Sequence, residues 1–361
     1  MKVKSLKLKN FRNYDLLDLK FDSTTNIFYG NNAQGKTNIL ESIYLGSTTK
    51  SHRNTKDKDI IRFGEDESHI ELMVEKNNVP FQIDMHIKKN SPKGIAINKK
   101  SIRKASELFG IVNIVFFSPE DLSIIKNGPS ERRRFMDLEL SQIDKIYLNS
   151  LLNYNRIINQ RNRLLKDMKF NDQLEETLDV WDEQLINYGN EVIDRRIKFI
   201  EEINKIISFI HKKLTGNKEN IKLHYESSLG NLSFEQALKK NRNKDFKIRS
   251  TSCGPHRDDI GFFINDLDLR KFGSQGQQRT AALSLKLSEI ELVKKITGDK
   301  PILLLDDVLS ELDKNRQNYL LDSIDGIQTL ITCTGVEEFI KHRFAINKIF
   351  HVNHGMVRNE N

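Results

Sequence analysis

The residues best suited to chemistry form the octapeptide GNNAQGKT, Gly30 to Thr37, which has the spacing G-x-x-x-x-G-K-[ST]. The glycines let backbone N–H groups turn inward around phosphate oxygens, Lys36 reaches the β and γ phosphates, and the Thr37 hydroxyl is a ligand for Mg²⁺. An apolar run at 26–29 precedes the segment, and a helical pattern at 38–47 follows it, so a helix N-terminus adds partial positive charge. We therefore predict a triphosphate site formed by Gly30, Asn31, Asn32, Ala33, Gln34, Gly35, Lys36 and Thr37.

A magnesium-triphosphate site also needs carboxylates at the end of a strand, and PILLLDD at 301–307 supplies them. Its apolar residues predict a buried parallel strand whose carboxyl end presents Asp306, the position at which ligands bind in α/β sheets. We expect Asp306 to hold Mg²⁺ through water. Asp307 is expected to orient or deprotonate the attacking water, which makes Lys36 and Asp307 the catalytic candidates.

A second anion site is predicted by the segment GSQGQ, at 273–277, which precedes a helical pattern. The Ser274 hydroxyl, the Gly276 amide and Gln277 lie where the helix begins, and a helix N-terminus attracts anions. In a two-fold dimer this segment can close over the γ-phosphate held by the other chain's Gly30–Thr37 loop. The alternative interpretation is a simple helix cap.

The net charge of +8 is concentrated in the first third of the chain, where residues 1–120 hold 20 Lys/Arg against 14 Asp/Glu. The stretch from His86 to Ser106 has no acidic residue and predicts a surface for a polyanion such as DNA. Its seven basic residues are Lys88, Lys89, Lys93, Lys99, Lys100, Arg103 and Lys104. A solvated hairpin that is basic by chance is the alternative. Three arginines at 132–134, near the start of a predicted helix, are expected to have an acidic or phosphate partner.

The elements that must position these residues follow from hydrophobic periodicity. Period-two alternation at 3–11, 16–21, 68–76, 79–89 and 93–100 predicts short strands, the first two of them an edge hairpin. The stretches 130–168 and 174–214 are predicted to be helical, with apolar residues three and four apart from Leu174 to Val192 and further apolar residues from Ile197 to Leu214. Two helices of about 40 residues each would extend about 60 Å as an antiparallel arm. We expect an N-terminal lobe at 1–120, the arm at 121–220 and a C-terminal lobe at 221–361.

The composition is that of a globular protein, with 37% hydrophobic and 30% charged residues. Charges interrupt the first twenty residues, and no apolar run approaches the roughly 18 residues of a membrane span, so a cytoplasmic location is expected. Two cysteines, Cys253 and Cys333, offer neither a disulfide framework nor a metal-binding CxxC spacing, which favours a reducing compartment.

Taken together, the motifs resemble those of ABC-type ATPases, and within them the SMC/Rad50-like heads. GNNAQGKT is similar to Walker A, GSQGQ to the signature, ILLLDD to Walker B and SELD (Ser310 to Asp313) to the D-loop. More narrowly, LKNFRNY, FFSPEDL, GPSERRRFMD, CGPHRDD and SQGQQRTAALSLKL are similar in order and spacing to the RecF family of bacterial recombination mediators. The resemblance implies an α/β, ABC-type (SMC/Rad50-like) P-loop ATPase head split by an antiparallel helical arm.

The same resemblance implies an ATP- and Mg²⁺-dependent DNA-binding homodimer. Such a protein acts at single-strand gaps and gap junctions in replication, recombinational repair and the SOS response, and works with RecO and RecR to load RecA. Asp307 stands where ABC proteins usually have the longer Glu, which suggests slow, DNA-stimulated hydrolysis used as a switch. The usual switch histidine is replaced by Thr332 and Thr334.

Several points stay open in this comparison. We identify no Q-loop glutamine. Arg53 could contact ATP or DNA, and Arg257 could support a dimer interface, or either could make structural ion pairs. Two other classes compete with the DNA-binding ATPase: a transporter-type ABC subunit, which would need no long arm, and a nuclease-associated ATPase, which would need a second metal site.

Overall fold

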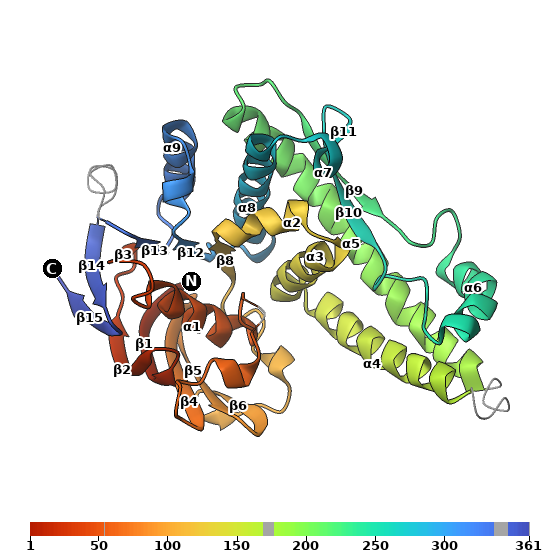
Figure 1. Cartoon of the computed structure of the whole chain (residues 1–361), viewed down its shortest axis with the longest axis horizontal. Helices are drawn as coiled ribbons and strands as arrows, with labels where there is room; N and C mark the ends of the chain where they lie inside the picture. Colours follow the sequence, from red (N-terminus) through yellow and green to blue (C-terminus); the bar gives the residue numbers. More distant parts are fainter. Residues whose placement is uncertain (54, 169–176, 336–345, 361) are drawn as a thin grey trace. The chain divides into compact units, whose positions relative to one another are not determined.

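The computed structural model describes residues 1–53, 55–168, 177–335 and 346–360 (Figure 1). The chain divides into two compact units. Unit 1 comprises Met1–Asp121 and Lys286–Asn361, and unit 2 comprises Leu122–Leu285. Each unit has its own sheet or sheets and its own core, and they are described separately.

Unit 1 contains an antiparallel sheet in the order β2-β1-β4-β5-β6-β7. Its strands are β1 (Lys2–Phe11), β2 (Tyr14–Lys20), β4 (Glu67–Lys76), β5 (Val79–Lys88), β6 (Ser91–Ile97) and β7 (Lys100–Ser101). In β1, Leu6 and Leu8 are buried while Lys7 and Lys9 are exposed, which is the alternation expected of a sheet with one solvated face. The predicted strands and the edge position of β2 are confirmed.

The second sheet of unit 1 has the order β15-β14-β3-β13-β12-β8. Its strands are β3 (Thr25–Tyr29), β8 (Ile114–Phe117), β12 (Ile302–Asp306), β13 (Thr329–Cys333), β14 (Ile346–Asn353) and β15 (Met356–Asn359). All neighbours are parallel except β14 and β15. Every residue of β12 is buried, as its apolar run predicted. The parallel order brings the carboxyl ends of β3, β12 and β13 to one edge.

Helix α1 (Lys36–Thr48) connects the two sheets, because it contacts strands of both. Its buried residues include the consecutive run Ile39–Thr48, so the helix lacks a solvated face, as expected for an element enclosed between layers. Helix α9 (Lys314–Ser323) follows β12 and is capped by the Asp313 carboxylate, which accepts from the Arg316 N–H. Because α1 follows β3 after a short loop, its first residues lie at the carboxyl edge of the parallel sheet.

Unit 2 is built on a helical hairpin. It contains α2 (Leu122–Lys126), α3 (Pro129–Ile143), α4 (Lys145–Asp167), α5 (Leu178–Leu214), α6 (Phe234–Ile248) and α7 (Leu269–Phe272). Helices α4 and α5 pack side by side (Figure 1). The prediction of one helix over 130–168 is wrong, because Asp144 adopts an extended conformation and its side chain caps a new helix by accepting from the Ile146 and Tyr147 N–H groups. Leu174 lies outside the described residues.

A three-stranded sheet, β11-β10-β9, completes unit 2 and changes the expected division at residue 220. It is formed by β9 (Ile221–Glu226), β10 (Asp259–Ile264) and β11 (Leu267–Asp268). The Asn204 side chain on α5 bonds to both the N–H and the C=O of Leu223 on β9. Residues 221–285 therefore cluster with the arm helices, and the long helix α8 (Gln275–Thr297) begins in unit 2 and ends in unit 1.

Candidate nucleotide site

The predicted phosphate loop connects β3 to α1, as its motif requires. Gly30 and Gly35 have φ angles of 147° and 114°, which side chains rarely adopt. A Cβ atom at Gly30 would lie 2.3 Å from the Val352 carbonyl oxygen, and one at Gly35 would lie 2.6 Å from the Asn13 side chain. Both glycines are therefore required by conformation and by space, and the loop ends at the N-terminus of α1.

Lys36 lies over this loop. Its Nζ atom donates to the carbonyl oxygens of Gly30, at 2.6 Å, and Asn31, at 2.9 Å, and the side chain is buried. Burial lowers the pKa of Lys36, and this effect is opposed by the nearby carboxylates of Asp307 and Asp306. The ammonium group is thus held in the loop by weak neutral acceptors, which a phosphate oxygen can replace.

The predicted partners of the loop lie beside it. The Thr37 hydroxyl donates to Asp306 Oδ1 at 2.7 Å, a contact between residues 269 positions apart. The hydroxyl of Thr332, at the end of β13, donates to the same oxygen at 2.7 Å and accepts the Asp307 N–H at 3.0 Å. Thr37 and Asp306 thus present adjacent oxygens, the ligand type that Mg²⁺ prefers.

Asp307 follows Asp306 in the left-handed region, with φ at 53°. Its N–H donates to the Thr332 hydroxyl at 3.0 Å and to the Thr332 carbonyl at 3.3 Å. Burial raises the pKa of Asp307; Lys36 opposes this shift and Asp306 adds to it. A carboxylate with a raised pKa is a better proton acceptor than an ordinary one, which agrees with the predicted role.

The signature segment begins α8 in unit 2. The Ser274 hydroxyl accepts the Gln277 N–H at 3.2 Å, while Gln277 Oε1 accepts the Ser274 N–H at 2.9 Å, forming a reciprocal cap. The Gln277 amide also donates to Glu219 at 3.0 Å. Ser274 and Gly276 are exposed, and a Cβ atom at Gly276 would meet only Ser274 Oγ, at 3.9 Å. Packing among the described residues therefore does not explain why this position is glycine.

Comparison with known proteins decides the family. The profile described as "RecF/RecN/SMC N terminal domain" matches residues 2–358. The chain is 64% identical over 363 residues to the DNA replication and repair protein RecF of Lachnospira eligens, with both chains covered completely. The chain belongs to the RecF family. Its sequence is also 61% identical to the RecF of Agathobacter rectalis, with 99% of each chain covered.

Solved structures agree with this family. The RecF structure described as "the recombination mediator protein RecF-ATP in RecFOR pathway" is 37% identical, with a TM-score of 0.93 over 99% of this chain and 97% of that one. A Smc head domain from Pyrococcus furiosus, at 16% identity and a TM-score of 0.57, covers 99% of this chain and 95% of that one, and shares the fold. The ABC-type head is thereby confirmed, and the transporter alternative is not favoured.

The basic residues predicted to contact DNA do not form one cluster in this RecF-family chain. Lys88 ends β5, whereas the Lys99–Lys100 turn follows Ile97, which pairs with Ile83 in the middle of β5. Ile83 lies five residues, about 17 Å, before Lys88 along the strand. Lys89 pairs with Asp66 at 2.9 Å, and Lys93 is largely buried against Asp57 at 3.0 Å. Among the described residues no carboxylate lies within 4.0 Å of the other five, which are exposed: Lys88, Lys99, Lys100, Arg103 and Lys104.

Sequence reasoning missed one group beside the phosphate loop of this RecF-family chain. Arg12 makes a bidentate bond to the buried Glu41 on α1, at 2.7 and 2.9 Å. Burial would raise the pKa of Glu41, but the bonds from Arg12 and Ser51 hold it below its usual value. Arg53 bonds to Asn38 and lies 3.9 Å from Glu41, so its described contacts are those of a structural ion pair. The sequence feature that could have identified this pair is Arg12, which lies within the motif LKNFRNY.

Two further observations concern the alternatives. No helix among the described residues is long and apolar enough to cross a membrane. Within the same residues, no group of three or more His, Cys, Asp or Glu side chains is arranged to hold a metal ion.

Proposed function

We propose that this chain is an ATP-dependent DNA-binding protein of replication and recombinational repair, in which nucleotide controls a homodimer. The observation that carries the proposal is the 2.7 Å hydrogen bond from Thr37 to Asp306, which joins the phosphate loop to the strand carboxylate. Solved relatives described as RecF-ATP, with a TM-score of 0.93, support ATP as the nucleotide.

Four residues of unit 1 have different roles toward the nucleotide in this proposal. Thr37 and Asp306 would hold Mg²⁺, which neutralises charge on the phosphates when bound. Lys36 exchanges its two carbonyl acceptors for phosphate oxygens. Asp307 orients the attacking water and accepts its proton. An aspartate in place of the usual glutamate is consistent with slow hydrolysis. The dimer would then persist until ATP is hydrolysed.

The dimer in this proposal is closed by ATP. The exposed helix N-terminus of α8, with Ser274, Gly276 and Gln277, closes over the γ-phosphate bound by a second copy. The support is that Gly276 leaves open space in which, within the described part of the chain, a Cβ atom would meet only the Ser274 hydroxyl. Because ATP contacts both copies only in the closed state, its hydrolysis removes the stabilisation and releases the dimer.

DNA in the gap-containing form expected for the RecF family is the proposed substrate. The exposed group Lys99, Lys100, Arg103 and Lys104 supplies phosphate contacts that are not sequence specific. RecO and RecR are the proposed partners, and RecA loading the proposed outcome, because solved relatives are described within the RecFOR pathway. DNA affinity should fall steeply as salt rises.

Sedimentation velocity of the Asp307→Asn variant tests the dimer. With Mg-ATP we expect a dimer, and with ADP or no nucleotide a monomer, because slowed hydrolysis keeps the γ-phosphate in place. A monomer under all three conditions, with gapped DNA present as well, would contradict the proposal.

Two variants of Ser274 separate the dimer site from a helix cap. Ser274→Arg should keep nucleotide binding but prevent dimerisation. Ser274→Asp retains a good capping side chain while placing a negative charge against the γ-phosphate, so it should also prevent dimerisation. If the aspartate variant dimerised normally with ATP, Ser274 would be a helix cap only.

A further inference from the structure

The loop Thr251–Asp259, which joins α6 to β10 in unit 2, is bonded by arginines from three helices. Arg161 on α4 donates to the Thr251 hydroxyl at 2.8 Å. Arg133 on α3 donates to the Asp258 carbonyl at 2.8 Å, and Arg196 on α5 donates to the Pro255 carbonyl at 2.6 Å. Arg257, within the loop, donates weakly to the Thr251 carbonyl at 3.4 Å. These four guanidinium groups bond to backbone carbonyls or a hydroxyl of the loop.

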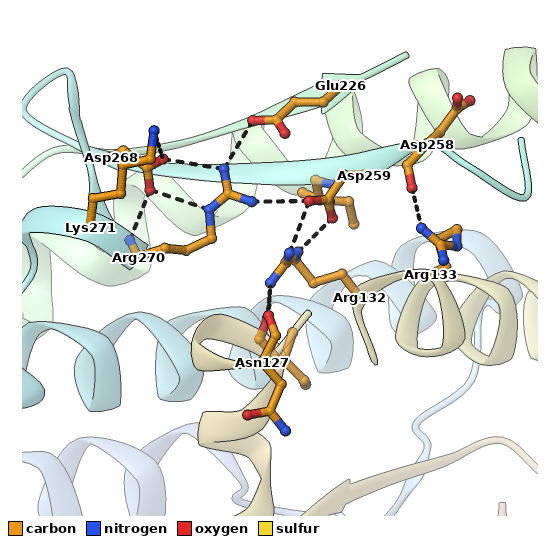
Figure 2. Close-up of polar contacts among 11 residues, drawn as sticks. Asn127, Arg132, Arg133, Glu226, Asp258, Asp259, Asp268, Arg270 and Lys271 are labelled. Atoms are coloured by element: carbon orange, nitrogen blue, oxygen red, sulfur yellow. Dashed lines mark hydrogen bonds and ion pairs between the residues drawn. The ribbon is translucent and has the colours of Figure 1, made fainter. Parts of the chain in front are cut away.

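The carboxylates of the same loop are already engaged. Asp259 accepts two bonds from the buried Arg132, at 2.6 and 2.9 Å, and one from Arg270 at 3.0 Å (Figure 2). Asp258 accepts the Tyr225 hydroxyl at 2.5 Å and the Ser228 N–H at 2.7 Å. Asp259 is thus paired with two arginines, whereas the Asp258 carboxylate accepts from neutral donors in these two bonds and is not within 4.0 Å of a described Lys or Arg side chain.

Arg133 and Arg257 differ from the neighbouring arginines in what they contact. Arg196 lies 2.6 Å from Asp137, and Arg132 2.6 Å from Asp259. Within the described part of the chain, no carboxylate lies within 4.0 Å of Arg133 or Arg257, whose bonds go to neutral carbonyls. Figure 2 shows the Arg133 guanidinium directed to the Asp258 backbone, beside the Arg132–Asp259 pair. A planar guanidinium has five N–H donors, so most of those on Arg133 stay available to a ligand.

His256, in the same loop, is hydrogen-bonded through both ring nitrogens. Its Nε2 donates to the Thr251 carbonyl at 3.1 Å, so Nδ1 accepts the Tyr154 hydroxyl at 2.6 Å. Burial lowers the pKa of His256 to about 4, and the charges of Arg257, Arg133 and Arg196 contribute to the shift. With this pKa the ring is neutral at pH 7 and adds no positive charge to that of the arginines. Burial, followed by Arg196, likewise lowers the pKa of Arg133, and the carboxylates of Asp259, Asp137 and Asp258 oppose this shift.

We infer that Arg133 and Arg257 form an anion site that binds a phosphate group of a nucleic-acid backbone. The planar guanidinium fork matches the geometry of two phosphate oxygens, and Arg133 is held in place by the Asp258 carbonyl before any ligand arrives. A phosphate supplies the anionic oxygens that neither guanidinium has within 4.0 Å among the described residues. The inference rests on the proposed DNA-binding function and adds a contact in unit 2 that is separate from the basic residues of unit 1.

The test measures binding of the full chain, with Mg-ATP, to a fluorescent gapped DNA duplex at several salt concentrations. Arg133→Gln and Arg257→Gln should each lower DNA affinity several-fold, up to about eightfold at 0.1 M salt. Each should also make the slope of log K against log salt shallower by about 0.9, as expected when one phosphate contact to duplex DNA is lost. Arg133→Lys keeps the charge and should restore the slope while recovering only part of the affinity.

Arg163→Gln is the matched control. Arg163 on α4 is 79% exposed and lies 3.8 Å from Asp167, so its substitution removes the same charge from unit 2 without touching the loop. DNA affinity should change by less than about twofold. Arg257 is exposed, so Arg257→Gln decides the question by itself if substitution of Arg133 prevents folding.

The outcomes separate this inference from the function on which it rests. ATP affinity, measured in parallel, should be unchanged in every variant; reduced ATP affinity instead of reduced DNA affinity would mean that the anion bound here is free nucleotide. If the parent chain binds DNA and both glutamine variants bind equally well, the inference alone is overturned. Unchanged DNA binding with a weakened ATP-dependent dimer would assign the arginines to contact between copies, which also overturns it. If the parent chain does not bind gapped DNA, the proposed function itself is wrong.

Discussion

The nucleotide site of unit 1 and the buried Arg132–Asp259 pair of unit 2 use charge in different ways. Around the phosphate loop, Lys36 is held by neutral carbonyls, and Asp306 accepts only hydroxyl groups among its described hydrogen bonds. In unit 2, Arg132 and Asp259 are paired directly at 2.6 Å and buried. The first arrangement leaves charges that a ligand can engage, whereas the second satisfies them within the chain.

This difference separates residues kept for ligands from residues kept for the fold. A buried ion pair leaves no charge for a ligand. If one partner is lost, the other charge stays unpaired in the protein interior, where it is poorly solvated. A charge held by neutral groups can exchange them for a stronger partner. The contrast predicts that substitutions in the paired set act on stability, and those in the unpaired set on binding.

The largest effect is expected from breaking the pair in unit 2. Asp259→Ala leaves Arg132 buried without its carboxylate and should lower the free energy of unfolding by about 3–5 kcal/mol, measured by urea denaturation. Asp167→Ala, at an exposed i,i+4 pair on α4, is the control and should change stability by less than about 0.5 kcal/mol. Similar values for the two variants would remove the distinction.

Lys36→Ala should act on binding instead of stability. The loss of the only ammonium in the phosphate loop should weaken ATP binding by about 100-fold or more, measured by isothermal titration calorimetry. Lys50→Ala, at an exposed lysine two residues after α1, should bind ATP normally. If Lys36→Ala strongly lowered the urea concentration at the unfolding midpoint, Lys36 would instead belong to the residues that stabilise the fold.

His256 gives the 251–259 loop a measurable pH dependence. Because the folded pKa of about 4 lies below the ordinary 6.5, the unfolded chain binds more protons between these values. The stabilisation is complete above pH 6.5 and is lost as pH falls toward 4, by about 2 kcal/mol after allowance for partial solvent access. Unfolding midpoints of the parent chain and His256→Gln should therefore converge over this range. Parallel pH profiles would show that His256 titrates normally.

The smallest effect concerns the position of the two carboxylates of unit 1. Thr332→Val removes the hydroxyl that bonds both Asp306 and the Asp307 N–H, and should lower kcat for ATP hydrolysis about fivefold with little change in KM. Thr332→Ser keeps the hydroxyl and should restore the rate. Equal rates for the valine and serine variants would exclude a positioning role.

Much of the architecture could be predicted because its signals are local. Strand alternation, the buried run at 302–305 and the phosphate loop each lie within a few consecutive residues, and the structure has them where expected. The break at Asp144 was missed because the helical pattern continues across it, and only the capping bonds end one helix and begin the next. The seven basic residues lie close enough together in the sequence to suggest one surface patch. The pairing of β5 with β6 separates them along the sheet.

The sequence by itself determined the phosphate loop and the strand carboxylates, because glycine conformation and the strand-to-helix order are encoded within short segments. Only the tertiary structure decided which distant groups meet them. Thr332 reaches Asp306 through the parallel pairing of β12 with β13, and Arg132 meets Asp259 across 127 residues. Such partners are selected by the register in which strands pair and by the free-energy cost of burying an unpaired charge. Neither can be predicted from the spacing of residues within a short segment.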